Sequence, residues 1–186
     1  MRYPKEHKEQ ARQRLVAGGA RLAKKRGFAA AGVDDLAAAA GVTSGAVYKH
    51  FGGKSELLAA IIAAELARSE AMFAAVPVGD AARLDKVLAG YLSAAHVERP
   101  ESGCPLPSLT AEVARADDAV RQAFEDGLVA VHAAVKRHVS SGDAAWALIA
   151  QSVGAVMIAR ALPDAATRAK VLAAAKRAAR AAAATE

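Results

Sequence analysis

The sequence contains little cysteine and little proline. Among its 186 residues there is one cysteine, Cys104, so an intrachain disulfide and a cysteine-rich zinc or iron–sulfur site are excluded. There are six prolines, whereas alanine is abundant and hydrophobic residues make up 54% of the chain. This composition predicts an almost entirely helical protein, with either one large domain or two small ones.

Catalytic, metal-binding and targeting patterns are also missing. Neither H-E-x-x-H nor G-x-S-x-G occurs and the five histidines are scattered, so we expect no catalytic residue, no metal site and no cofactor. The N-terminal residues "MRYPKEHKEQARQR" lack the apolar segment of a signal peptide. The most apolar stretch, "AAWALIAQSVGAVMIARAL", contains Gln151, Ser152 and Arg160, which favours a buried helix over a membrane span. These features predict a cytoplasmic protein that is not an enzyme.

Positive charge is concentrated at the start of the chain. The formal net charge is +6; residues 1–55 hold 11 Lys or Arg against 4 Asp or Glu, whereas residues 56–186 hold 14 against 15. This asymmetry favours a polyanion as partner of the N-terminal third over a general solubility role. Three cations, Lys24, Lys25 and Arg26, end the first expected helix, where we expect them to favour the helix dipole rather than contact DNA.

Glycine- and proline-containing breaks divide the chain into helices. Gly18 and Gly19 lie inside the first of them, so we expect another helix to pack closely there. The predicted class is all-α, with a three-helix domain at 1–54 and a helical bundle at 55–186. The expected helices run from Pro4 to about Arg26, then over 33–41, 44–51, 55–75, 80–98, 107–115, 117–140, 143–161 and 164–184.

The second and third expected helices, joined by "GVTS", have the pattern of a helix-turn-helix, with Gly41 in the turn. Val47 and Phe51 are four residues apart and share the buried side of the third helix, and Lys49 falls on the opposite side. An exposed face of this kind suits a helix lying in the major groove of DNA, and an ordinary helical hairpin with solvated polar residues is the competing interpretation.

The residue types on that face match the chemistry of a DNA duplex. Small residues let the backbone approach, a lysine can reach guanine O6 and N7, and the alanine methyl can meet a thymine methyl. Tyrosine and histidine on the flanks can donate to phosphates, the threonine can cap the helix or bond a phosphate, and Lys54 stands before the next helix, whose first amides also favour a phosphate. The predicted DNA-binding residues are Thr43, Ser44, Gly45, Ala46, Tyr48, Lys49, His50 and Lys54.

The segment "GFAAAGVDDLAAAAGVTSGAVYKHFGGKSELL" resembles the DNA-binding segment of TetR-family transcriptional regulators, and the resemblance covers about residues 10–60. It implies a dimeric all-helical repressor of about nine helices, a small-molecule site in the C-terminal domain and a palindromic operator. By position, Tyr48, His50 and Lys54 resemble the phosphate contacts, and Ser44, Ala46 and Lys49 the base-reading residues.

The sequence departs from the usual family pattern at several positions. Ala31 and Gly32 stand where the family usually has Thr or Ser before the second helix, which weakens its cap by about 1 kcal/mol. Ser44 replaces a frequent lysine, which indicates less nonspecific affinity. Ala23 replaces a frequent phenylalanine, so the small core must be filled differently.

Cys104 lies in "ESGCPLPSLTAEVARADDAVRQAF", where Pro105 keeps it out of helical geometry. The stretch resembles a segment of one TetR subgroup, some members of which use this cysteine to sense electrophiles or oxidants. A buried, inert cysteine is the alternative, and no cation flanks the thiol closely in sequence. The predicted effector-binding or sensing residues are the aromatic, polar and sulfur side chains of the C-terminal region: Tyr91, His96, Cys104, Phe124, His132, Trp146 and Met157.

The last two expected helices contain small residues, Ala150, Gly154 and Ala155, that permit close approach. The resemblance implies a homodimer interface through about 143–184, and a dimer is also expected because one recognition helix of two turns reads too few bases. The preferred function is a ligand-responsive transcriptional regulator, a repressor released by a small molecule or by modification of Cys104. A nonspecific or architectural DNA-binding protein is the alternative, and a helical enzyme is disfavoured by the missing catalytic residues.

Overall fold

A computed structural model describes residues 5–184, and within that range the chain contains α-helices and one 3-10 turn but no strand. The all-α prediction is therefore confirmed. The elements are α1 (Lys5–Arg26), α2 (Val33–Ala40), α3 (Ser44–Phe51), α4 (Lys54–Ala74), α5 (Ala81–Tyr91), α6 (Ala94–Glu98), η1 (Pro100–Ser102), α7 (Leu106–Val113), α8 (Asp118–Lys136), α9 (Gly142–Ala161) and α10 (Ala165–Ala184).

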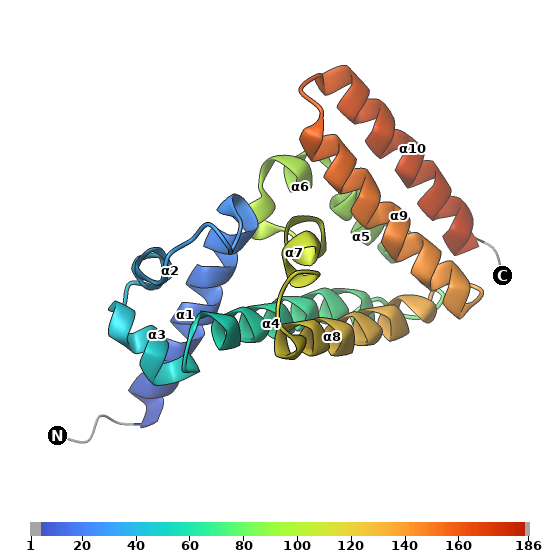
Figure 1. Cartoon of the computed structure of the whole chain (residues 1–186). Helices are drawn as coiled ribbons and strands as arrows, with labels where there is room; N and C mark the ends of the chain where they lie inside the picture. The colour runs from blue at the N-terminus through green and yellow to red at the C-terminus, as the bar shows by residue number, and fades with distance from the viewer. Residues whose placement is uncertain (1–4, 185–186) are drawn as a thin grey trace.

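The helices form a three-sided arrangement (Figure 1). Helices α1, α2 and α3 pack together at one corner, and α4 leads away from them beside α8. The N-terminal helices and the pair α4 and α8 form two sides, and the pair α9 and α10 forms the third. The shorter elements α5, α6, η1 and α7 lie between these sides. One end of α1 contacts η1 and α7, so the N-terminal helices touch the rest of the chain at more than one place.

Helix α4 holds the two parts of the fold together. Its apolar residues at i and i+4 spacing, Leu57, Ile61 and Ile62 among them, are fully buried. Further along, Gly127 of α8 faces Leu66 so closely that an added Cβ would lie 2.7 Å from the leucine Cβ. The missing side chain at Gly127 therefore allows the close pairing of α4 with α8.

Most expected helices are confirmed, but 80–98 is two helices rather than one. The backbone at Leu92 leaves α-helical geometry, with φ −90° and ψ 44°. Ser93 then caps a new helix, since its hydroxyl accepts a hydrogen bond from the His96 amide. Neither this serine cap nor the later 3-10 turn was predicted from the sequence. Helix α8 ends at Lys136, whereas its predicted end was at about 140.

Helix α9 is long and apolar enough to cross a membrane by length and composition, with a mean hydropathy of 1.4 over its most apolar window. It packs against α8 and α10, burying Leu148 and Val156. On its other side Trp146, Met157 and Ile158 are about half exposed. The prediction of a buried helix is therefore correct for one face only.

The two glycines of α1 lie at close approaches, as expected. A Cβ at Gly18 would lie 2.5 Å from the Ala39 carbonyl oxygen of α2, and one at Gly19 would lie 2.8 Å from a terminal methyl of Ile61. The first neighbour is rigid backbone, whereas the second is the end of a flexible side chain.

We expect Gly18→Ala to destabilise the protein by about 1–3 kcal/mol, because α1 and α2 must separate. Gly90→Ala in α5 is the matched control: a Cβ there meets nothing within 4 Å, so alanine should stabilise the helix by about 0.5–1 kcal/mol. Urea unfolding at fixed protein concentration measures both. Equal effects of the two substitutions would contradict the close approach of α1 to α2.

Candidate nucleic-acid interface and adjoining cavity

Helix α3 presents its polar side chains away from the protein. Val47 and Phe51 are buried against the core, whereas Tyr48 is 59% exposed. Lys49 and Gly45 are exposed as well. The orientation predicted from helical spacing is therefore the observed one.

A hydrogen bond between neighbouring helices fixes α3 in this orientation. The Ser44 hydroxyl donates to the Asp34 carboxylate of α2. Thr43 occupies the position before the helix, but its side chain makes no capping bond. Of its two predicted roles, the capping role is therefore not observed. Gly41, in a left-handed conformation at φ 67°, allows the tight turn between the helices.

Gly32 precedes α2 and offers no side-chain cap, as expected. Its own amide donates to the Asp35 carboxylate at 2.9 Å, so one free amide of the helix start is satisfied. Ala23, another of the noted departures, is buried in the hydrophobic core.

Two of the predicted phosphate-binding side chains, His50 and Lys54, interact with neighbouring groups of the protein. Partial burial, followed by the charges of Lys8, Lys49 and Arg12, lowers the pKa of His50, so its ring is neutral at pH 7 and keeps one N–H donor. The Lys54 amine donates to the Ala29 carbonyl at 3.0 Å and lies 5.0 Å from the centre of the Phe28 ring. Lys54 is therefore tethered to the α1–α2 connection, with two further N–H groups left to donate.

The α1–α2 connection is also bound from the other side by α7. The Glu112 carboxylate accepts hydrogen bonds from the amides of Phe28, at 2.9 Å, and Ala29, at 2.6 Å. Gly27 has φ 84°, and a Cβ there would lie 2.9 Å from a Glu112 oxygen. Glu112 thus joins the C-terminal bundle to the connection that leads into α2.

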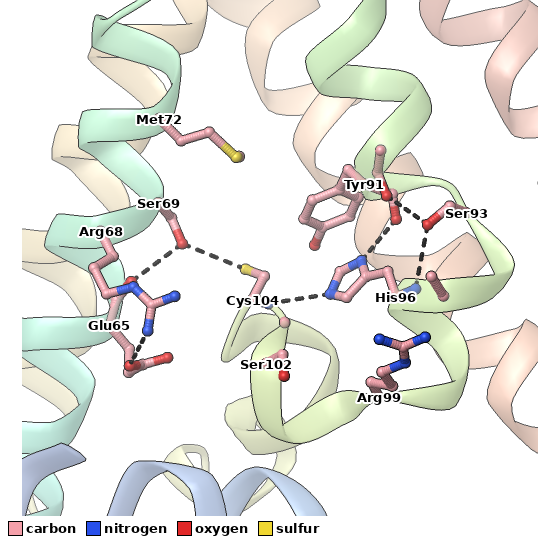
Figure 2. A pocket seen from close by; sticks show the side chains of 13 residues that line it. Glu65, Arg68, Ser69, Met72, Tyr91, Ser93, His96, Arg99, Ser102 and Cys104 are labelled. Atoms are coloured by element: carbon pink, nitrogen blue, oxygen red, sulfur yellow. Dashed lines mark hydrogen bonds and ion pairs between the residues drawn. The ribbon is translucent and has the colours of Figure 1, made fainter.

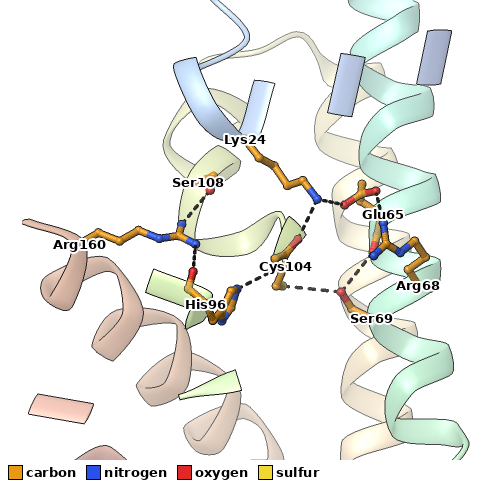
Figure 3. A network of polar contacts seen from close by, with 9 residues as sticks. Lys24, Glu65, Arg68, Ser69, His96, Cys104, Ser108 and Arg160 are labelled. Carbon is orange, nitrogen blue, oxygen red and sulfur yellow. Dashed lines mark hydrogen bonds and ion pairs between the residues drawn. The ribbon is translucent and has the colours of Figure 1, made fainter. Parts of the chain in front are cut away.

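A buried ion pair makes a second connection (Figure 3). The Lys24 amine of α1 lies 2.5 Å from the Glu65 carboxylate of α4 and donates to the Gly103 carbonyl at 2.8 Å. The lysine and glutamate side chains are 1% and 8% exposed. Arg68 donates to the other glutamate oxygen at 3.1 Å. The expectation that Lys24 serves the helix dipole is wrong, since its amine is buried between α1, α4 and the turn after η1.

A cavity of about 450 Å³ lies on the other side of that turn, between α4, α5 and α6 (Figure 2). We call it the Cys104 cavity. Three predicted effector residues come together in its wall: Tyr91, His96 and Cys104. The full lining is Glu65, Arg68, Ser69, Met72, Gly90, Tyr91, Ser93, Ala95, His96, Arg99, Ser102, Gly103 and Cys104.

His96 organises this wall. Its Nδ1 lies 2.6 Å from the Tyr91 carbonyl, and its Nε2 accepts the Cys104 amide proton at 3.1 Å. This pattern requires a neutral ring with its proton on Nδ1. Burial, the largest cause, lowers the pKa of His96, and the charges of Arg160 and Lys24 act in the same direction. His96 therefore stays neutral at pH 7 and holds Cys104 in place.

The thiol and the phenol in this wall are also uncharged. Burial raises the pKa of Cys104, and hydrogen bonds, including one from the Ser69 hydroxyl 3.7 Å away, offset only part of the effect. Burial also raises the pKa of Tyr91 well above its ordinary value. At neutral pH Cys104 is therefore a thiol rather than the more reactive thiolate.

The other predicted effector residues, Phe124, His132, Trp146 and Met157, do not line the Cys104 cavity. His132 stacks on Trp146 with ring centres 4.1 Å apart and bonds the Gly142 carbonyl at 2.9 Å. Trp146 and Met157 are 41% and 42% exposed on the outer face of α9. Grouping all seven residues in one pocket is therefore incorrect, because helical spacing does not distinguish a cavity-facing side of a helix from an outer one.

Four residues of this region were not predicted from the sequence: Glu65, Arg68, Arg99 and Glu112. The sequence does indicate that Glu65 is buried, since it lies four residues after Ile61 on the apolar face of α4. A carboxylate on such a face requires a buried partner. The sequence does not indicate which cation supplies it.

We expect Lys24→Met to destabilise the protein by about 3–5 kcal/mol, because it leaves the buried Glu65 carboxylate without its closest partner. The double substitution with Glu65→Leu should cost clearly less than the sum of the two single ones. Urea unfolding of the four proteins at one concentration gives the coupling energy. Additive single effects would mean that the two charges do not stabilise each other.

Known proteins match both the sequence of this interface and the fold. The model of "bacterial regulatory proteins, tetR family" matches residues 15–61. The transcriptional regulator SrpR of Pseudomonas putida is 44% identical over 55 residues, 30% of this chain and 26% of SrpR. TtgR of the same species is 39% identical over 62 residues, 33% of this chain and 30% of TtgR. The chain thus matches these relatives over less than a third of their length.

Solved structures match over nearly the whole chain. The reduced form of NemR from Escherichia coli has a TM-score of 0.74 at 24% identity, covering 95% of this chain and 99% of that one. A regulatory protein TetR from Rhodobacter sphaeroides has a TM-score of 0.73 at 24% identity, covering 92% and 97%. At these identities the likeness concerns the fold: an N-terminal helix-turn-helix domain followed by a helical bundle.

The two kinds of match are complementary. The sequence matches lie on α1 to α4, which include the helix-turn-helix, and the structural matches extend through α10. The matched family consists of regulatory proteins, in agreement with the prediction that the chain is not an enzyme. Residues 15–61 thus match the tetR family of bacterial regulatory proteins in sequence, and the chain shares the fold of solved TetR-family structures.

Proposed function

We propose that the protein is a dimeric, ligand-responsive transcriptional repressor that binds a palindromic operator through α3 and acts in the cytoplasm. Residues 1–54 form the DNA-binding domain and residues 55–186 the effector-binding and dimerisation domain. The observation that carries this proposal is the division of α3 into a buried side, Val47 and Phe51, and an exposed side with Tyr48 and Lys49.

The exposed side supplies both kinds of DNA contact. Gly45 and Ala46 let the helix backbone approach the bases, and Lys49 reaches guanine O6 and N7. Tyr48 and His50 donate to phosphates on the flanks, and Thr43 has a hydroxyl that no capping bond occupies. Lys54 adds a phosphate contact next to the first amides of α4. Ser44 was predicted to read bases, but its hydroxyl is bonded to Asp34, and we propose that it contributes by positioning α3.

Dimerisation uses α9 and α10, over about 143–184. The outer face of α9 exposes Trp146, Met157 and Ile158 beside Gly154, an apolar surface with room for a neighbouring helix. Two copies related by a two-fold axis would present two α3 helices to successive turns of DNA, and this doubles the number of bases read.

Release follows from the position of the Cys104 cavity. A small molecule in the cavity, or a group added to Cys104, acts on the segment that contains Gly103 and Glu112. That segment holds Lys24 and the α1–α2 connection, so its displacement changes the orientation of the helix-turn-helix. The spacing of the two α3 helices then no longer fits the operator.

Selection of bound duplexes from a random pool tests DNA recognition. We expect enrichment of one palindrome, with affinity that falls steeply as salt rises. Lys49→Ala should cost about 1–3 kcal/mol and relax the preference at the base that Lys49 reads. Arg121→Ala on α8 removes the same charge from an exposed site and is the control. If no palindrome is enriched and Lys49→Ala weakens binding to all sequences equally, the protein is instead an architectural DNA-binding protein.

N-ethylmaleimide tests the thiol route. We expect it to lower operator affinity of the native protein but not of Cys104→Ser. Because the thiol pKa is raised, the rate should increase about tenfold per pH unit through the neutral range. Loss of affinity in Cys104→Ser at the native rate would exclude modification of Cys104 as the cause and leave the noncovalent route.

A further inference from the structure

The lining of the Cys104 cavity carries more positive than negative charge. Two guanidinium groups border it, that of Arg68 from α4 and that of Arg99 from the end of α6 (Figure 2). Glu65 is the acid in the lining, and it is already paired with Lys24 and with Arg68. Arg99 takes part in no ion pair among the residues that the structure describes. The imidazole of His96 adds no charge at neutral pH.

The inner wall of the cavity is mainly apolar, and its polar groups are the side chains of Ser69, Tyr91 and Cys104. Met72 and Tyr91 line it, and both also border a smaller cavity of about 30 Å³ that continues toward Leu88 and Val135. The Tyr91 hydroxyl is buried, and among the described residues it makes no hydrogen bond of normal geometry; the weakly polar Cys104 thiol is the side chain that interacts with it. A buried unpaired hydroxyl is unfavourable, and a polar atom of a bound molecule would satisfy it.

We propose that the Cys104 cavity binds a small organic anion with an apolar, ring-sized body. Its carboxylate or sulfonate lies between Arg68 and Arg99, and its body packs against Met72 and Tyr91. A neutral apolar molecule would leave Arg99 without a counter-charge, and a cation would be repelled by the net positive lining. The proposal rests on the proposed function, because it names the chemical class of the effector for the same site.

The same charges connect occupancy with the DNA-binding helices. An anion bound to Arg68 competes with Glu65 for one guanidinium group. Glu65 in turn binds Lys24 of α1, and Lys24 binds the Gly103 carbonyl in the cavity wall. Binding of an anion therefore acts directly on the ion pair that joins α1 to α4.

Two fluorescent probes with the same aromatic skeleton test the proposal. 8-Anilinonaphthalene-1-sulfonate carries a sulfonate, and N-phenyl-1-naphthylamine does not. We expect the native protein to bind the sulfonate at one saturable site per chain, at least about tenfold more tightly than the neutral probe, as charge-assisted hydrogen bonds would give. Arg68→Gln and Arg99→Gln should each weaken the sulfonate several-fold and leave the neutral probe unchanged, and the control Arg121→Gln should change neither.

Gly90→Leu tests whether the probe occupies this cavity. Gly90 lines it, and a Cβ there meets nothing within 4 Å, so leucine would fill space without disturbing α5. We expect this variant to lose most of the saturable sulfonate signal. If the signal persists in Gly90→Leu and in both arginine variants, the probe binds elsewhere and the proposal is wrong.

Equal affinity for the two probes would also overturn the proposal, because the site would then select by shape alone. Operator binding is measured on the same samples without a probe, so the outcomes are separable. If the protein binds DNA sequence-specifically but does not prefer the anionic probe, the proposed ligand class is wrong and the proposed regulatory function stands. If the protein prefers the anionic probe but recognises no operator, the proposed regulatory function is wrong and the anion site stands.

Discussion

The buried ion pair between Lys24 and Glu65 joins the end of α1 to α4 inside the protein. Removing two charges from water is costly, and the cost is offset only where the geometry is good and the remaining donors have partners. Here the lysine also binds the Gly103 carbonyl and the glutamate also binds Arg68, so each charge has a second partner. The end of α1 is therefore attached to α4 and to the turn after η1 at one point.

The segment from Gly103 to Glu112 lies between the Cys104 cavity and the N-terminal helices and contacts both. On one side its backbone and Cys104 form the wall of the cavity, held by the His96 ring. On the other side the Gly103 carbonyl binds Lys24, and Glu112 binds two amides of the α1–α2 connection. The same short segment therefore contacts both the cavity and the connection that leads into the helix-turn-helix.

Sequence reasoning was most accurate where the interaction is local. The side of α3 that is buried follows from two apolar residues four apart, and Val47 and Phe51 lie as expected. It was least accurate for the proposed effector site. Tyr91, His96 and Cys104 meet in one wall, but Trp146 and Met157 lie on the outside of α9. All five are aromatic or sulfur-containing side chains, and residue type alone does not separate a cavity lining from an exposed apolar surface.

The helical class, the helix-turn-helix and the exposed face of α3 were determined by the sequence itself, because helical periodicity and glycine-containing turns act over a few residues. The tertiary structure decided which charges are buried and which surround the cavity. Lys24 meets Glu65 across 41 positions and Gly103 across 79. No local pattern encodes such a pairing, since it exists only once α1, α4 and the turn after η1 have packed together.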